Sequence, residues 1–148
     1  MSPIRRGMMG IAALAFAGCP TLPLGAQPSA PQQNARIVTR SDITVVSGSV
    51  LRVGNETFRI RGLRTPRPSR GRCLFERIRG REARKALRRL LSRGEIAIIP
   101  TGLLTPRGEK LARVTVDGKS VRARLIERDA AHPRAGYEKG NPWCVNLG

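Results

Sequence analysis

Short β-rich segments alternate with turn residues around one long helical pattern, and this order restricts the possible folds more than any other feature. Alternating or β-branched residues predict strands at 43–46, 50–53, 57–61, 95–100 and 111–116. Gly54-Asn55 and Asp117-Gly118 are typical of tight turns between strands. Several strands with few helices indicate an α+β fold. We therefore expect a small five-stranded OB-like β-barrel with two or three helices.

The longest helical pattern covers residues 79–92. Its apolar stripe consists of Ala83, Ala86, Leu87, Leu90 and Leu91. Arginines and a lysine occupy or flank the opposite side. A shorter helix is expected after Ser120, whose hydroxyl suits an N-cap. Residues 62–71 contain two prolines and are expected to form a loop, and residues 130–148 are expected to be irregular.

The first 26 residues have the pattern of an export signal. Arg5 and Arg6 precede an apolar run at 7–18 that is too short to span a bilayer. Cleavage is expected after Ala26. The alternatives are cleavage after Ala17 and a lipoprotein signal acylated at Cys19.

The remaining chain is then divided into a polar linker at 27–35 and a folded domain at 36–148. The protein is expected to be exported, either periplasmic or secreted. Two cysteines remain once Cys19 leaves with the signal, and in an oxidising compartment Cys73 and Cys144 most simply form a disulfide. The other possibility is two buried free thiols.

The chain is strongly basic, with 28 Lys and Arg against 10 Asp and Glu and a net charge of +18. Such a surface attracts nucleic acid, anionic lipid or acidic polysaccharide, although codon usage alone can also enrich arginine. Aromatic residues make up only 3%, which argues against a base-stacking binder. The single histidine, His132, excludes a multi-histidine zinc site and is expected on a surface loop.

The segment order resembles the staphylococcal nuclease-like (thermonuclease) family. Residues 47–50 (SGSV) and 58–67 (FRIRGLRTPR) look like the family's DGDT and (F/I)R-L-x-G-I-D-(A/T)-P-E stretch. The segment 104–112 occupies the slot of the family's D-(R/K)-Y-G-R-x-L-A motif. The resemblance covers nearly all of 43–144, and also includes the helix at 82–91, residues 116–121 and 125–126, and the pair Trp143-Cys144.

The family binds one Ca²⁺ through carboxylates and hydrolyses phosphodiesters, but the matching positions here carry other residues. The metal-binding Asp of DGDT falls at Ser49, the Asp of D-A-P-E falls at Arg64, and only Thr65 is retained. The general-base Glu falls at Arg67. Hydroxyls beside guanidinium groups are poor ligands for a hard cation. The resemblance therefore implies that the Ca²⁺ site and the family's catalysis are lost, and no cofactor is expected.

Arginines replace the missing acids. Of the family's two phosphate-binding arginines, the first is retained as Arg59 and the second falls at Glu109, which we expect to pair with a nearby arginine. Arginine binds phosphate through two parallel hydrogen bonds. The candidate anion-binding residues are Arg59, Arg61, Arg64, Arg67, Arg70 and Arg72. Glu76 and Glu82 are expected to form ion pairs with arginines of the helix.

Three functions remain open. The first is an exported, catalytically inactive nuclease homologue that binds nucleic acid or another polyanion without sequence preference, as a monomer. The second is an active nuclease that uses a variant mechanism. The third is an envelope protein that contacts anionic lipid or cell-wall polymer. Neutral decay of the family's site would also account for the substitutions.

Overall fold

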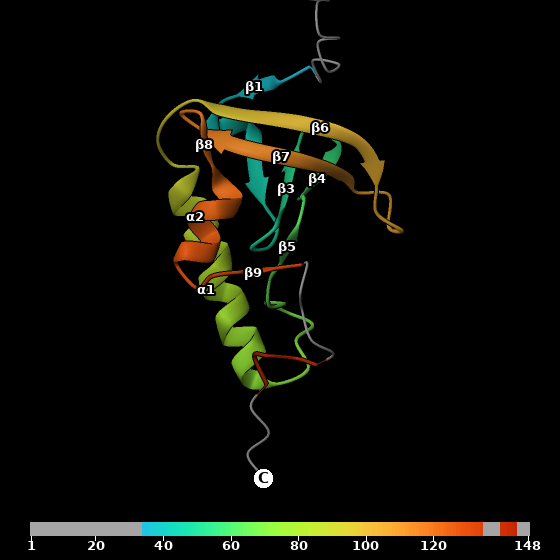
Figure 1. Ribbon diagram of the computed structural model, residues 1–148, viewed down its shortest axis with the longest axis vertical. Helices are drawn as coiled ribbons and strands as arrows, with labels where there is room; N and C mark the ends of the chain where they lie inside the picture. The colour runs from blue at the N-terminus through green and yellow to red at the C-terminus, as the bar shows by residue number, and fades with distance from the viewer. Residues whose placement is uncertain (1–33, 135–139, 145–148) are drawn as a thin grey trace, which may run out of the picture. The chain divides into compact units, whose positions relative to one another are not determined.

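A computed structural model describes residues 34–134 and 140–144, and shows an α+β fold in which a curled mixed sheet packs against two helices (Figure 1). The predicted signal and most of the predicted linker lie outside the described residues. The strands are β1 (Arg36–Val38), β2 (Ile43–Val45), β3 (Val50–Val53), β4 (Glu56–Ile60), β5 (Leu63–Arg64), β6 (Ile96–Leu104), β7 (Lys110–Val116), β8 (Lys119–Ser120) and β9 (His132–Pro133). The helices are α1 (Leu74–Leu90), α2 (Val121–Glu127) and the 3₁₀ turn η1 (Arg40–Asp42).

The main sheet has the strand order β1-β6-β7-β4-β3-β2, with β8 paired to β7. Its neighbours are antiparallel except for β4 and β7, which run parallel. The sheet is a curled half-barrel, so the prediction of an OB-like barrel is confirmed only in this coarse form (Figure 1). The strands at the two ends of this order, β1 and β2, are consecutive in the chain. Thr39 and η1 lie between these two strands. The Asp42 carboxylate accepts hydrogen bonds from the Thr39 N–H (3.0 Å) and hydroxyl (2.6 Å), and these bonds favour a local turn that interrupts the extended chain.

The core lies between the concave side of the sheet and the helices. Leu51 and Phe58 from the sheet, and Leu87 and Leu125 from the helices, are all at most 2% exposed. Alternation along β4 buries Phe58 and Ile60 and leaves Arg59 half-buried on the other side. The apolar pattern of the sequence therefore predicts the buried side of β4 correctly.

The helix α1 begins at Leu74, five residues earlier than the pattern predicts. Cys73 is the N-cap, and its sulfur accepts a hydrogen bond from the Glu76 N–H at 3.4 Å. The first turns escaped the prediction because their apolar residues, Leu74, Phe75 and Ile78, are exposed. Instead, Glu76 occupies the buried stripe at the position one turn before Gly80.

Several further elements differ from the predictions. The expected loop at 62–71 contains β5, which pairs with β9 in the expected irregular tail. Strand β6 continues to Leu104, and β1 was not predicted at all. The N-cap of α2 is confirmed, because the Ser120 hydroxyl accepts a hydrogen bond from the Ala123 N–H. Within 34–134 and 140–144, no helix is long and apolar enough to cross a membrane.

Candidate anion-binding site

Arg59, the arginine that the sequence resemblance matched to a phosphate-binding position, is held by a bidentate ion pair. Its Nε lies 2.6 Å from Glu109 Oε2, and its Nη2 donates to Glu109 Oε1 at 3.1 Å. The two side chains are 25% and 15% exposed, so water screens this pair less than a surface pair. This confirms the expectation that Glu109 pairs with a nearby arginine.

Hydroxyl groups extend this ion pair into a polar network. The Ser49 hydroxyl is fully buried, lies 2.9 Å from the Thr65 hydroxyl, and accepts a hydrogen bond from Arg59 Nη1 at 3.4 Å. The Thr105 hydroxyl donates to Glu109 Oε2 at 3.1 Å. We call these five residues the Arg59–Glu109 network. The hydrogen bonds and charge of Arg59 lower the pKa of Glu109, against a smaller opposing effect of burial.

The donor set of this network does not fit the calcium ion that the family resemblance implies. Ca²⁺ takes six to eight oxygen ligands and depends on carboxylates for its affinity. The Ser49 and Thr65 hydroxyls bond to each other, and the Glu109 carboxylate is engaged by a guanidinium group. Across the described part of the chain, no cluster of three or more His, Cys, Asp or Glu residues could hold a metal ion.

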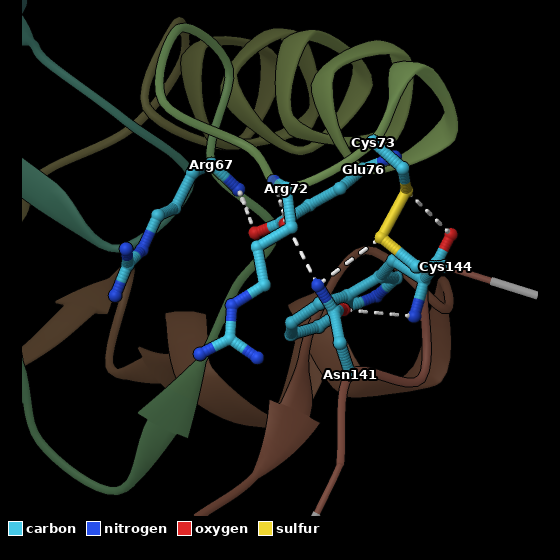
Figure 2. Close-up of a disulfide and its surroundings, with 7 residues drawn as sticks. Arg67, Arg72, Cys73, Glu76, Asn141 and Cys144 are labelled. Carbon is cyan, nitrogen blue, oxygen red and sulfur yellow. Dashed lines mark hydrogen bonds between the residues drawn. A yellow bond between two sulfur atoms is a disulfide. The ribbon is translucent and has the colours of Figure 1, made fainter.

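A second carboxylate, that of Glu76, organises the loop between β5 and α1. It is only 4% exposed. Its Oε1 accepts a hydrogen bond from the Arg67 N–H at 3.3 Å, and its Oε2 accepts from the Arg72 N–H and from Asn141 Nδ2, both at 2.7 Å (Figure 2). The prediction that Glu76 forms an ion pair within the helix is therefore wrong. Glu82 does form an ion pair within the helix, but its partner is Lys85, at 3.2 Å, and not an arginine.

Burial has the largest single effect on the pKa of Glu76 and raises it. The hydrogen bonds from Arg72, Asn141 and Arg67, together with the Arg67 charge, outweigh burial and lower the pKa overall. The carboxylate therefore stays ionised, although its three donors are two backbone N–H groups and a neutral amide.

Close packing also holds this loop against α1. A Cβ atom on Gly80 would lie 2.5 Å from the Arg67 carbonyl carbon and from the Pro68 nitrogen, so only glycine allows this approach. The side chains of Arg67 and Arg72 extend away from the Glu76 carboxylate (Figure 2). We define the arginine loop by four exposed arginines: Arg61, in the turn that follows β4, and Arg67, Arg70 and Arg72, which lie between β5 and α1.

The C-terminal segment 140–144 closes over the same region. Cys73 and Cys144 form a disulfide with a Cα–Cα distance of 5.9 Å, as the cysteine count predicts. Arg64 donates to the Gly140 carbonyl at 3.1 Å, and its guanidinium carbon lies 5.7 Å from the centre of the Trp143 ring. His132 is half-buried in β9, and its ring lies 5.6 Å from the Trp143 ring, so the expectation that His132 lies on a surface loop is wrong.

Neither a protein-family model nor a curated protein matches this sequence.

The structure brings only part of the predicted site together. Ser49, Arg59, Thr65 and Glu109 meet in one network, whereas Arg64 is engaged by the C-terminal segment. Sequence reasoning missed the role of Glu76. Continuing the apolar stripe of α1 towards its N-terminus, from Ala83 to Gly80 and then to Glu76, would have placed a carboxylate on the buried side.

Proposed function

We propose that this chain is an exported protein of staphylococcal nuclease-like fold that binds nucleic acid or a similar polyanion and lacks the family's calcium-dependent hydrolysis. One observation carries this proposal. Exposed arginines project from a loop whose backbone is fixed by the buried Glu76 carboxylate, and Glu76 uses uncharged donors for this. The guanidinium groups of Arg67 and Arg72 thus remain available to a ligand while their backbone is held.

The strand order supports the family resemblance. If β1 and β2 are taken as two parts of one interrupted strand, the sheet reads as five strands: β1/β2, β3, β4, β7 and β6. This order is related to that of an OB-like barrel, although the sheet here is a curled half-barrel and not a closed five-stranded barrel. The hairpin, α1, the second hairpin and α2 also follow in the expected order.

The arginine loop suits phosphate groups better than base edges. Arginine forks bind phosphate oxygens in pairs, and phosphate contacts carry no sequence information. Two of the six predicted anion-binding arginines are expected to contribute less to phosphate binding. Arg59 is neutralised by Glu109, and Arg64 donates to the Gly140 carbonyl. The proposal therefore depends on Arg61, Arg67, Arg70 and Arg72.

The binding test compares two sets of four arginine substitutions in the exported chain. The first set changes the arginine loop to glutamine, and the control set changes four other exposed arginines: Arg52, Arg88, Arg93 and Arg113. Both sets lower the net charge equally. Only the first should strongly weaken binding to duplex DNA. In that variant, the slope of log K (the DNA-binding constant) against log salt concentration should become shallower by about 0.9 for each phosphate contact that is lost. Equal weakening by both sets would contradict a localised site.

The catalytic part of the proposal has its own test. Purified exported protein should not hydrolyse DNA or RNA faster with Ca²⁺ or Mg²⁺ than with a chelator, because Ser49, Arg64 and Arg67 supply no carboxylate. Cleavage that a chelator abolishes would overturn the non-catalytic assignment and favour an active nuclease.

A further inference from the structure

We infer that the N-terminal end of α1 docks on an anionic lipid bilayer. The surface consists of three exposed apolar side chains, Leu74, Phe75 and Ile78, which we call the apolar tip. It does not include the arginine loop, and the inference does not depend on nucleic-acid binding.

The apolar tip points away from the core. Leu74 and Ile78 are one helical turn apart and lie opposite the buried stripe that contains Glu76 and Gly80. Their exposed fractions are 57% and 39%, and that of Phe75 is 54%. Three large apolar side chains gathered at one end of a helix cost free energy in water, so a cluster of this kind indicates a partner.

The same outward side of α1 becomes cationic after the tip. Arg77, Arg81 and Lys85 are all exposed there, and the acidic Glu82 on this side is paired with Lys85. Apolar side chains next to Lys and Arg are typical of surfaces that insert into the headgroup region of anionic membranes. The cations meet the phosphates, and the apolar side chains reach the acyl boundary.

This chemistry favours a bilayer over the other partners. Nucleic acid offers phosphates but no apolar layer to receive Leu74 and Ile78. A stable protein interface usually buries more than about 1,000 Å², which three side chains on one end of a helix do not supply. A bilayer needs only a small wedge that is held rigidly, and the Cys73–Cys144 disulfide anchors the residue that precedes Leu74.

The test measures binding of the exported protein to phosphatidylcholine vesicles with and without phosphatidylglycerol. The variant Leu74→Ser/Phe75→Ser/Ile78→Ser should bind the anionic vesicles at least about tenfold more weakly, because its apolar contribution is removed. Neutral vesicles should bind the wild type weakly. The control variant is Leu103→Ser/Leu104→Ser, which removes two exposed leucines at the end of β6. Neighbouring residues of a strand point to opposite sides and form no common patch, so the control should bind like the wild type.

Several outcomes would overturn the inference. If the triple variant binds the vesicles as well as the wild type, or if the control variant loses as much binding, the interaction is non-specific charge attraction and the apolar tip is not the docking surface. Loss of a dimer by the triple variant in sedimentation velocity would make a second copy of the chain the partner. Circular dichroism and an intact disulfide establish that the triple variant is folded. Its DNA binding should be unchanged, so failure here and failure of the proposed function are distinguishable.

Discussion

Two glutamates with lowered pKa values stand in contrasting regions of this molecule. Glu109, at the sheet, is satisfied mainly by the guanidinium group of Arg59. Glu76, at the start of α1, is satisfied by two backbone N–H groups and the Asn141 amide. The first arrangement cancels the charge of an arginine, whereas the second fixes the backbone of an arginine loop and leaves the guanidinium groups exposed.

The contrast shows how one chain can stabilise its structure near a basic surface and still keep that surface attractive to anions. An ion pair between side chains stabilises the fold, but it neutralises the positive charge that would bind an anionic ligand. Hydrogen bonds from neutral donors can hold a loop without engaging its side chains. In the Arg59–Glu109 network the arginine charge is already neutralised, so the Glu76 region is the better candidate for anion binding.

The largest effect is expected when the covalent anchor of the Glu76 region is removed. In Cys73→Ser/Cys144→Ser the serine can still cap α1, so the variant isolates the loss of the disulfide. The bond closes a loop with a sequence separation of 71 residues. The free energy of unfolding should fall by up to about 4 kcal/mol in the chain-entropy model. Urea unfolding measures this loss, and an unchanged midpoint would show that segment 140–144 is held without the disulfide.

Next in size is the loss of the buried carboxylate. In Glu76→Gln one acceptor oxygen becomes an NH₂ group that faces N–H donors. The free energy of unfolding should therefore fall by about 2–3 kcal/mol. DNA affinity should fall too, because the arginine loop loosens. Glu82→Gln on the exposed side of α1 is the control and should alter neither quantity measurably. If Glu76→Gln unfolds more easily but binds DNA normally, the carboxylate does not organise the binding site.

A smaller loss is expected at the sheet. Glu109→Gln leaves the half-buried Arg59 without its anion, so stability should fall by about 1–2 kcal/mol. DNA affinity should rise or stay constant in this variant, since a positive charge is released. The two variants should therefore change DNA affinity in different directions, with a fall in Glu76→Gln and no fall in Glu109→Gln. A fall in DNA affinity in both variants would contradict the proposed difference between the two regions.

The smallest effects concern pH and salt. The pKa values of Glu76 and Glu109 are lower in the folded chain than the ordinary value of 4.5, so the unfolded chain binds more protons in acid. Their contribution to stability is complete above pH 4.5 and is lost as the pH falls through the folded pKa values. Added salt should weaken the contribution of Glu109 more than that of Glu76, whose donors are uncharged. Unfolding midpoints of the two Gln variants across pH and salt measure this difference, and equal salt responses would contradict it.

The parts of the fold that sequence reasoning predicted are those governed by neighbours in the chain. Alternation predicts the buried side of β4, the Gly54-Asn55 turn predicts the β3–β4 hairpin, and Ser120 predicts the start of α2. The early start of α1 was missed because Leu74 and Ile78 are apolar yet exposed. β5 and β9 were missed because strands of two residues have no periodicity to detect.

The sequence by itself determined the α+β class, the amphipathic stripe of α1, the pair of cysteines that can bond and the absence of carboxylates at Ser49 and Arg64. Only the tertiary structure decided which charges are cancelled and which remain exposed. The Arg59–Glu109 pair joins residues 50 positions apart, and the Glu76–Asn141 contact joins residues 65 apart. A buried or half-buried carboxylate must accept hydrogen bonds from donors that lie within about 3 Å in the folded chain. Local sequence patterns do not reveal these donors when they are distant in the sequence.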